Sequence, residues 1–127
     1  MKKTLALTAA GTLLATPLAV LVAAPAAHAD VDRKGACGTG RYELSVDREG
    51  SRHEVSVDLD RVPARSSWIV QITQDGKKIA HVTRTAARDG ELDVERVVAD
   101  TAGKDTFRFT AKRVGARTSC GASVVVS

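Results

Sequence analysis

Apolar and polar residues alternate in short runs along most of the chain after its first forty residues. Seven runs show this period of two, and they cover residues 42–46, 54–60, 68–73, 78–83, 91–95, 106–111 and 120–126. Such alternation is typical of β-strands that bury one face and expose the other. The sequence contains no convincing helical period and no internal repeat. The pattern therefore predicts an all-β fold.

Turn-forming residues such as Gly, Asp and Pro separate these runs. Seven short strands in about a hundred residues are typical of an antiparallel β-sandwich. We therefore predict a single seven-stranded antiparallel sandwich over residues 37–127.

A different kind of segment precedes the strands. Lys2 and Lys3 are followed by an apolar run over residues 5–22 and by the small residues Ala27 and Ala29. This order is typical of a secretory signal peptide cleaved after an A-x-A site. A membrane anchor is the alternative, but threonines and a proline interrupt a run that is barely long enough to span. We expect a signal peptide at 1–29, no remaining membrane anchor, a short segment at 30–36, and a secreted protein.

The chain has two cysteines, Cys37 and Cys120, one near each end of the expected mature protein. Exported chains meet oxidising conditions, so an even number of cysteines indicates a disulfide. Their wide separation matches no zinc-ligand spacing. A nucleophilic thiol would leave the second cysteine unexplained. We predict a Cys37–Cys120 disulfide that ties the two terminal strands together at one end of the sandwich.

The seven runs resemble an immunoglobulin-like or fibronectin-type-III-like sandwich, because Trp68 falls on the third strand, as the core tryptophan does in immunoglobulin domains. The chain also resembles small secreted actinobacterial β-sandwich proteins that have no assigned role. The resemblance covers residues 37–127 and departs from immunoglobulin domains in having no cysteine on the second and sixth strands. No function follows from a fold that is used so widely.

Charge bears on the pairing of the first two predicted strands. A two-residue turn at 49–50 would place Asp47 opposite Arg52, whereas a slip by two residues would place Asp47 opposite Glu54. Like charges that face each other across a strand pair are unfavourable. We therefore predict the first register.

Asp75-Gly76 is a strong hairpin signal. A two-residue loop there would turn Ile79 and His81 inward, whereas a three-residue loop ending in a glycine bulge would turn Ala80 and Val82 inward. We favour the second arrangement, because it buries two apolar residues and exposes the histidine.

The sequence offers little support for catalysis. It contains no G-x-S-x-G, H-E-x-x-H or phosphate-binding loop. His53 and His81 are interpreted as surface or rim residues, since no nucleophile accompanies them. The many strand carboxylates indicate a solvated acidic face, because they lack the loop cage that calcium usually takes. We expect a protein that is not an enzyme and has no cofactor or metal.

One end of the predicted sandwich is rich in arginine. The loops at the end where the first and last strands begin carry Arg61, Arg65, Arg84, Arg88, Arg113 and Arg117. Loops on a rigid scaffold commonly carry binding functions, and arginine suits the oxygens of carboxylate or phosphate groups. A solubilising rim is the alternative interpretation.

Two functions fit these features. The first is a non-catalytic binding module that engages an anionic extracellular or envelope polymer or protein. The alternative is an inhibitor of a secreted protease that presents Arg117 or Arg65 on a loop. Nucleic acid is not expected as a partner, because the formal charge of +4 falls to +2 when Lys2 and Lys3 leave with the signal peptide.

Overall fold

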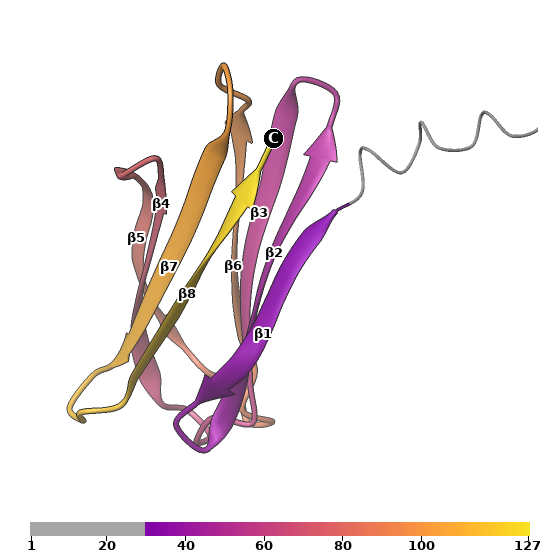
Figure 1. Ribbon diagram of the computed structural model, residues 1–127. Coiled ribbons are helices and arrows are strands. Elements are labelled where there is room, and N and C mark those ends of the chain that lie inside the picture. Colours follow the sequence, from indigo (N-terminus) through magenta and orange to yellow (C-terminus); the bar gives the residue numbers. More distant parts are fainter. Residues whose placement is uncertain (1–29) are drawn as a thin grey trace, which may run out of the picture.

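The computed structural model describes residues 30–127, which form two facing β-sheets (Figure 1). The strands are β1 (Val31–Cys37), β2 (Gly40–Glu49), β3 (Arg52–Asp60), β4 (Ser67–Gln74), β5 (Lys77–Thr85), β6 (Leu92–Ala99), β7 (Asp105–Arg113) and β8 (Ser119–Val126). One sheet has the order β1-β2-β3-β6 and the other β5-β4-β7-β8, and all neighbouring strands are antiparallel. The all-β class is confirmed. The expected signal peptide, residues 1–29, lies outside the described residues.

The strand count differs from the sequence prediction, because the described residues form eight strands and not seven. The additional strand is β1, which occupies the segment that we expected to precede the domain. It pairs with β2 from Val31 opposite Val46 to Cys37 opposite Gly40. Most of its side chains are exposed, so β1 has no alternation to detect. Its pairing rests on backbone hydrogen bonds, which every residue type except proline can donate.

The hydrophobic core lies between the two sheets. The largest fully buried side chains are Trp68, Phe107 and Phe109. The ring of Tyr42 packs from the other sheet against Phe109, with the ring centroids 5.1 Å apart. The alternation in the sequence predicts that Val57, Leu59, Trp68, Val94, Phe107 and Phe109 point inward, and all six are buried. Burying one large apolar side chain stabilises a fold by about 1.5–3 kcal/mol, so this layer is the main source of stability.

The predicted register of β2 and β3 is wrong. Asp47 lies opposite Glu54, and the turn consists of Gly50 and Ser51. Gly50 adopts a φ of 63° at the first position of this turn, a conformation that glycine adopts without steric cost. The predicted register would have placed Glu49 there instead. The conformational preference of the turn therefore contributes more to the stability of this register than a cross-strand charge pair, which contributes only about 0.2–1 kcal/mol.

The β4–β5 hairpin combines features of both expected arrangements. Asp75 and Gly76 form a two-residue turn with φ values of 51° and 85°, as a type I′ turn requires. A bulge follows, because the register shifts between Ile72 and Thr73. Ala80 is consequently buried and His81 exposed. The predicted orientation is confirmed, but a bulge within the strand produces it and not a longer loop.

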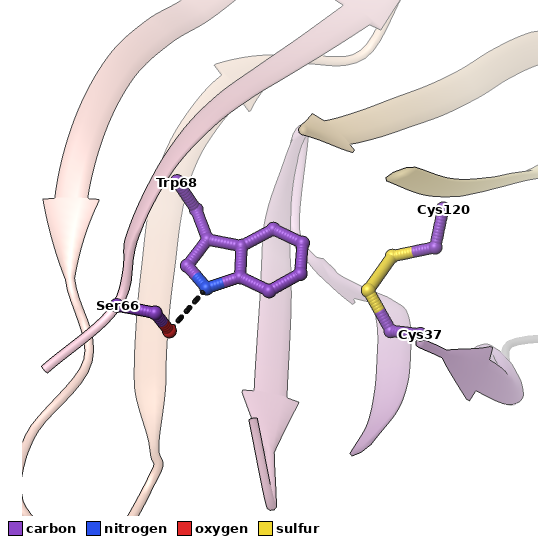
Figure 2. The surroundings of a disulfide bond; sticks show 4 residues. All are labelled: Cys37, Ser66, Trp68 and Cys120. Carbon is purple, nitrogen blue, oxygen red and sulfur yellow. Dashed lines mark hydrogen bonds between the residues drawn. A yellow bond between two sulfur atoms is a disulfide. The ribbon is translucent and has the colours of Figure 1, made fainter. Parts of the chain in front are cut away.

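A disulfide joins Cys37 at the end of β1 to Cys120 in β8, as predicted (Figure 2). The two Cα atoms are 5.1 Å apart and the cysteines are separated by 83 positions. Because β1 and β8 are edge strands of different sheets, the bond covalently links the two layers. Such a bond indicates an oxidising, extracellular environment. Within residues 30–127 the structure contains no helix long and apolar enough to cross a membrane.

Replacing Cys120 with serine should destabilise the fold strongly. A disulfide that closes a loop of this length contributes about 2–4 kcal/mol to the free energy of unfolding. For a domain of this size the melting temperature should fall by at least roughly 10 °C. Thermal unfolding followed by circular dichroism measures this change, with Ser119→Ala as the control on the neighbouring exposed residue. An unchanged melting temperature, or free thiols in the native protein, would contradict the role assigned to the bond.

Candidate functional site

Four connecting segments lie at the same end of the sandwich, because antiparallel strands reverse direction at every turn (Figure 1). They are the β1–β2 turn and the loops at 61–66, 86–91 and 114–118. The topology places six arginines in or beside these loops, and together they are called the arginine end. Its members are Arg61, Arg65, Arg84, Arg88, Arg113 and Arg117.

The loop at 61–66 is held from both sides. The Val62 backbone N–H donates to the carbonyl oxygen of Gly90 at 3.2 Å. The Ser66 carbonyl accepts from the N–H of Ala86 at 2.8 Å. From the core, the indole N–H of Trp68 donates to the Ser66 hydroxyl at 2.8 Å (Figure 2). These hydrogen bonds restrain the loop from the neighbouring 86–91 loop and from the core.

Two members of the arginine end have unusual backbones. Arg61 and Arg65 both adopt a φ of 61°, which is uncommon for residues other than glycine. The chain is also packed tightly here, because a Cβ atom at Gly40 or Gly90 would collide with backbone atoms of the 61–66 loop. Backbone strain of this kind clusters at binding and catalytic sites. The strain motivates a functional hypothesis for these two arginines.

The charges of the arginine end are not neutralised internally. The ion pairs among residues 30–127 involve Lys34, Arg48 and His53 as the cationic partners, and no member of the arginine end. Five of the six arginines are exposed, and Arg113 is partly buried. Their guanidinium groups are therefore available to an external anion.

A hollow lies beside the β7–β8 loop at this end. Its volume is about 480 Å³. The lining combines the cations Lys112, Arg113 and Arg117 with the apolar side chains Ile69 and Val114. Val114 is 51% exposed and Ile69 is 38% exposed. A ligand in this hollow would meet positive charge and apolar surface together.

The sheet β1-β2-β3-β6 has an acidic outer face. Glu43, Asp58 and Asp93 lie side by side on three neighbouring strands. The pKa of Asp58 is raised by partial burial and by the negative charges of Asp93 and Glu43. The pKa of Glu54 is likewise raised by Glu49 and Glu95. These carboxylates repel one another at neutral pH, and the fold tolerates the repulsion.

His53 was expected at the surface or rim, and this expectation is wrong. Its side chain is completely buried at the start of β3. Its Nε2 atom lies 3.1 Å from Oδ1 of Asp100 and 3.3 Å from Oδ2 of Asp105. These three residues are called the His53 cluster, and they lie at the end of the sandwich opposite the arginine end. The imidazole ring also meets the edge of Phe107, with the centroids 5.4 Å apart.

The sequence contained a signal for this cluster. His53 continues the inward row that includes Val55 and Val57, and Asp105 continues the inward row of Phe107 and Phe109. Extending the period of two by one step on each strand would have placed both polar side chains inside. Asp100 lies beyond the end of β6, so only the folded loop brings it to the histidine.

Asp105 remains ionised despite its burial. Burial alone would raise its pKa, but hydrogen bonds donated by Thr101 and Gln74 outweigh this effect and lower the pKa to about 2. A carboxyl group with a lowered pKa stabilises the folded state above its ordinary pKa of 3.8. This contribution is lost as the pH falls toward 2.

Two regions of the described chain thus gather polar side chains in one place, namely the arginine end and the His53 cluster. The first displays charge to solvent, whereas the second buries it. No protein-family model, curated protein or solved structure matches the chain.

Replacing Asp58 with asparagine should stabilise the protein at neutral pH. An acid whose pKa is raised by folding holds its proton more tightly in the folded state, so its charge destabilises the fold above that pKa. We expect the variant to be more stable at pH 7 by up to about 1 kcal/mol once solvent screening is included. The advantage should disappear as the pH falls to 3.8, the ordinary pKa of the group.

Urea unfolding between pH 7 and pH 3 measures this difference. Repeating the series in 0.5 M NaCl is the control. The difference between the variant and the parent should be smaller there, because salt screens repulsion between exposed carboxylates. A variant that is less stable at pH 7, or a difference that does not change with pH, would contradict the repulsion described for this face.

Proposed function

We propose that this protein is a secreted, non-catalytic binding module whose arginine end engages an anionic polymer or protein of the extracellular space or cell envelope. One observation carries the proposal. Six arginines gather in or beside the loops at one end of the sandwich, and none of them pairs with an acid among residues 30–127. Arginine binds carboxylate and phosphate oxygens through two parallel hydrogen bonds, so the partner should carry such groups.

A purely solubilising rim explains these features less well. An exposed charge contributes at most about 1 kcal/mol to stability even when it is paired, and neighbouring arginines repel. Solubility also needs no particular backbone conformation, whereas Arg61 and Arg65 both adopt left-handed φ values. Binding gives a reason for both the clustering and the strain.

The secreted location and the fold type belong to the same proposal. The basic and apolar start of the sequence supports export, and the Cys37–Cys120 disulfide is consistent with an oxidising environment. The ranges 42–46, 54–60 and 91–95 share one sheet, as β2, β3 and β6. This strand order supports an immunoglobulin-like or fibronectin-type-III-like sandwich.

Removing three charges from the arginine end should abolish salt-sensitive binding to isolated cell envelope. The variant carries Arg65→Asn, Arg113→Gln and Arg117→Gln, with asparagine chosen at 65 because it tolerates a positive φ. Retention is measured at 0.15 M and at 0.5 M salt. The increase in salt shortens the screening length from about 8 Å to about 4 Å. The parent protein should be retained at the lower salt and released at the higher.

The matched control removes three charges of the opposite sign from the acidic face, through Glu54→Gln, Asp93→Asn and Glu95→Gln. This variant should bind as well as the parent or better. If both variants behave alike, or if the parent shows no salt-sensitive retention, the arginine end is only a solvated rim.

Inhibition of a secreted protease is the second candidate function. Arg117 is exposed on the β7–β8 loop, which a hydrogen bond from the N–H of Arg113 to the carbonyl of Thr118 closes at 2.9 Å. Cys120 follows three residues later and fastens the chain to β1. A stiff loop that presents one basic residue suits a trypsin-like specificity pocket, because an acidic pocket accepts arginine.

An inhibitor should titrate a trypsin-like protease with a one-to-one end point and remain largely uncleaved. Arg117→Ala should abolish that inhibition, and a subtilisin-like protease should be affected less. Rapid cleavage after Arg117, or no inhibition by the parent at a large molar excess, would exclude this second function. The envelope-binding proposal would be unaffected by either result.

A further inference from the structure

The His53 cluster draws three potential metal ligands from separate parts of the chain. His53 lies at the start of β3, Asp100 in the β6–β7 loop and Asp105 at the start of β7. Each residue offers one ligand atom, and these atoms all lie within 4.8 Å of one another. The cluster is remote from the arginine end, so nothing inferred from it depends on the proposed function.

The spacing of the ligand atoms suits a small divalent ion. Zinc lies about 2.0–2.2 Å from imidazole nitrogen and carboxylate oxygen, so two ligands of a tetrahedral ion are roughly 3.3 Å apart. The Nε2 atom of His53 is 3.1 Å and 3.3 Å from its two carboxylate oxygens. One nitrogen and two oxygen ligands form a set that zinc and neighbouring transition metals accept.

The two carboxylates are oriented in the same way. Asp100 directs Oδ1 toward His53, while its Oδ2 accepts a hydrogen bond from Nη2 of Arg48 at 2.7 Å. Asp105 directs Oδ2 toward His53, while its Oδ1 accepts from the Thr101 hydroxyl and from Nε2 of Gln74. In each case one oxygen is fixed by a neighbouring side-chain donor and the other faces the imidazole, although Oδ2 of Asp105 also accepts from the backbone N–H of Thr101 at 3.4 Å. Outer hydrogen bonds of this kind orient the ligands in metal sites.

Burial also favours an ion at this position. Asp105 is 1% exposed and His53 is completely buried, and the donors that fix Asp105 are neutral. The Nδ1 atom of His53 has no hydrogen-bond partner among the described residues, so Nε2 is the ring atom through which the histidine makes its polar contacts. Buried carboxylates are stabilised by a cation that they coordinate.

We propose that His53, Asp100 and Asp105 bind one divalent transition-metal ion of the zinc class. The ion binds Nε2 of the neutral imidazole, whose one proton is then on Nδ1, and an imidazolium releases its Nε2 proton to solvent when the ion binds. Asp100 is 20% exposed at its side chain, which gives solvent access for entry and for a fourth ligand. The site ties the β6–β7 loop to β3 and so should hold the end opposite the disulfide together.

Calorimetric titration with ZnCl₂ of the full chain, stripped of metal with its disulfide intact, tests the proposal. We expect one ion per chain and a rise in melting temperature on binding. CoCl₂ should give the visible absorption of a tetrahedral site. CaCl₂ should bind much more weakly, because calcium prefers oxygen ligands only. Failure to bind Zn²⁺ at one ion per chain would overturn the proposal and leave the cluster as a hydrogen-bonded ion network.

Two histidine variants provide the matched comparison. His53→Gln should weaken zinc binding by at least about tenfold, whereas His81→Gln, at the exposed histidine of β5, should leave it unchanged. Unchanged binding in the first variant, or an equal loss in both, would overturn the proposal. Circular dichroism verifies that each variant is folded.

A measurement on the unaltered protein covers the case in which His53→Gln does not fold. Paramagnetic Co²⁺, which the preceding titration uses in place of zinc, broadens nuclear magnetic resonances close to its binding site. The amide signals of Thr101 and Phe107 should broaden first, and those of Cys37 and Arg117 should stay sharp. Broadening that begins elsewhere, for example at the acidic residues Asp58 and Asp93, would place the ion on the acidic face and overturn the proposal.

Discussion

Trp68 lies between the two sheets, fully buried, and its indole nitrogen donates a hydrogen bond to Ser66. This contact joins the core to the surface. Because Ser66 also accepts from the backbone of Ala86 and donates its hydroxyl hydrogen to the carbonyl of Pro63, the position of the indole determines the path of the loop at 61–66. The two strained arginines of that loop therefore depend on how one aromatic ring is packed.

The two ends of the sandwich manage charge in different ways. At the arginine end, loops and the adjoining strand ends carry guanidinium groups that form no ion pair among residues 30–127, which suits the recognition of an external anion. At the other end, the His53 cluster encloses its charges and satisfies the carboxylates with donors from several elements. Between the ends, a row of like-charged carboxylates on β2, β3 and β6 costs stability at neutral pH. The core and the disulfide offset this cost.

The candidate binding surface could be anticipated because it depends on topology alone. In an antiparallel sandwich, alternate loops fall at the same end whatever the details of pairing. The positions of Arg61, Arg65 and Arg117 at one end therefore followed from counting strands, and the additional strand β1 did not disturb the count. The left-handed backbones of Arg61 and Arg65 could not be foreseen. The loop at 61–66 packs against segments that are distant in sequence, and a Cβ atom at Gly40 or Gly90 would collide with its backbone at Arg61 or Val62.

The sequence by itself determined seven of the eight strands, the faces that they bury and the pairing of Cys37 with Cys120. Periodicity is a local property, and with two cysteines only one intramolecular pairing is possible. Tertiary structure decided the rest. Strand β1 forms through backbone pairing that leaves no side-chain pattern. The β2–β3 register follows the conformation of Gly50 and not charge. The inward positions of His53 and Asp105 continue the local period of two. Their contact with each other and with Asp100 arises only when the sheets have packed, because the three residues are distant in sequence.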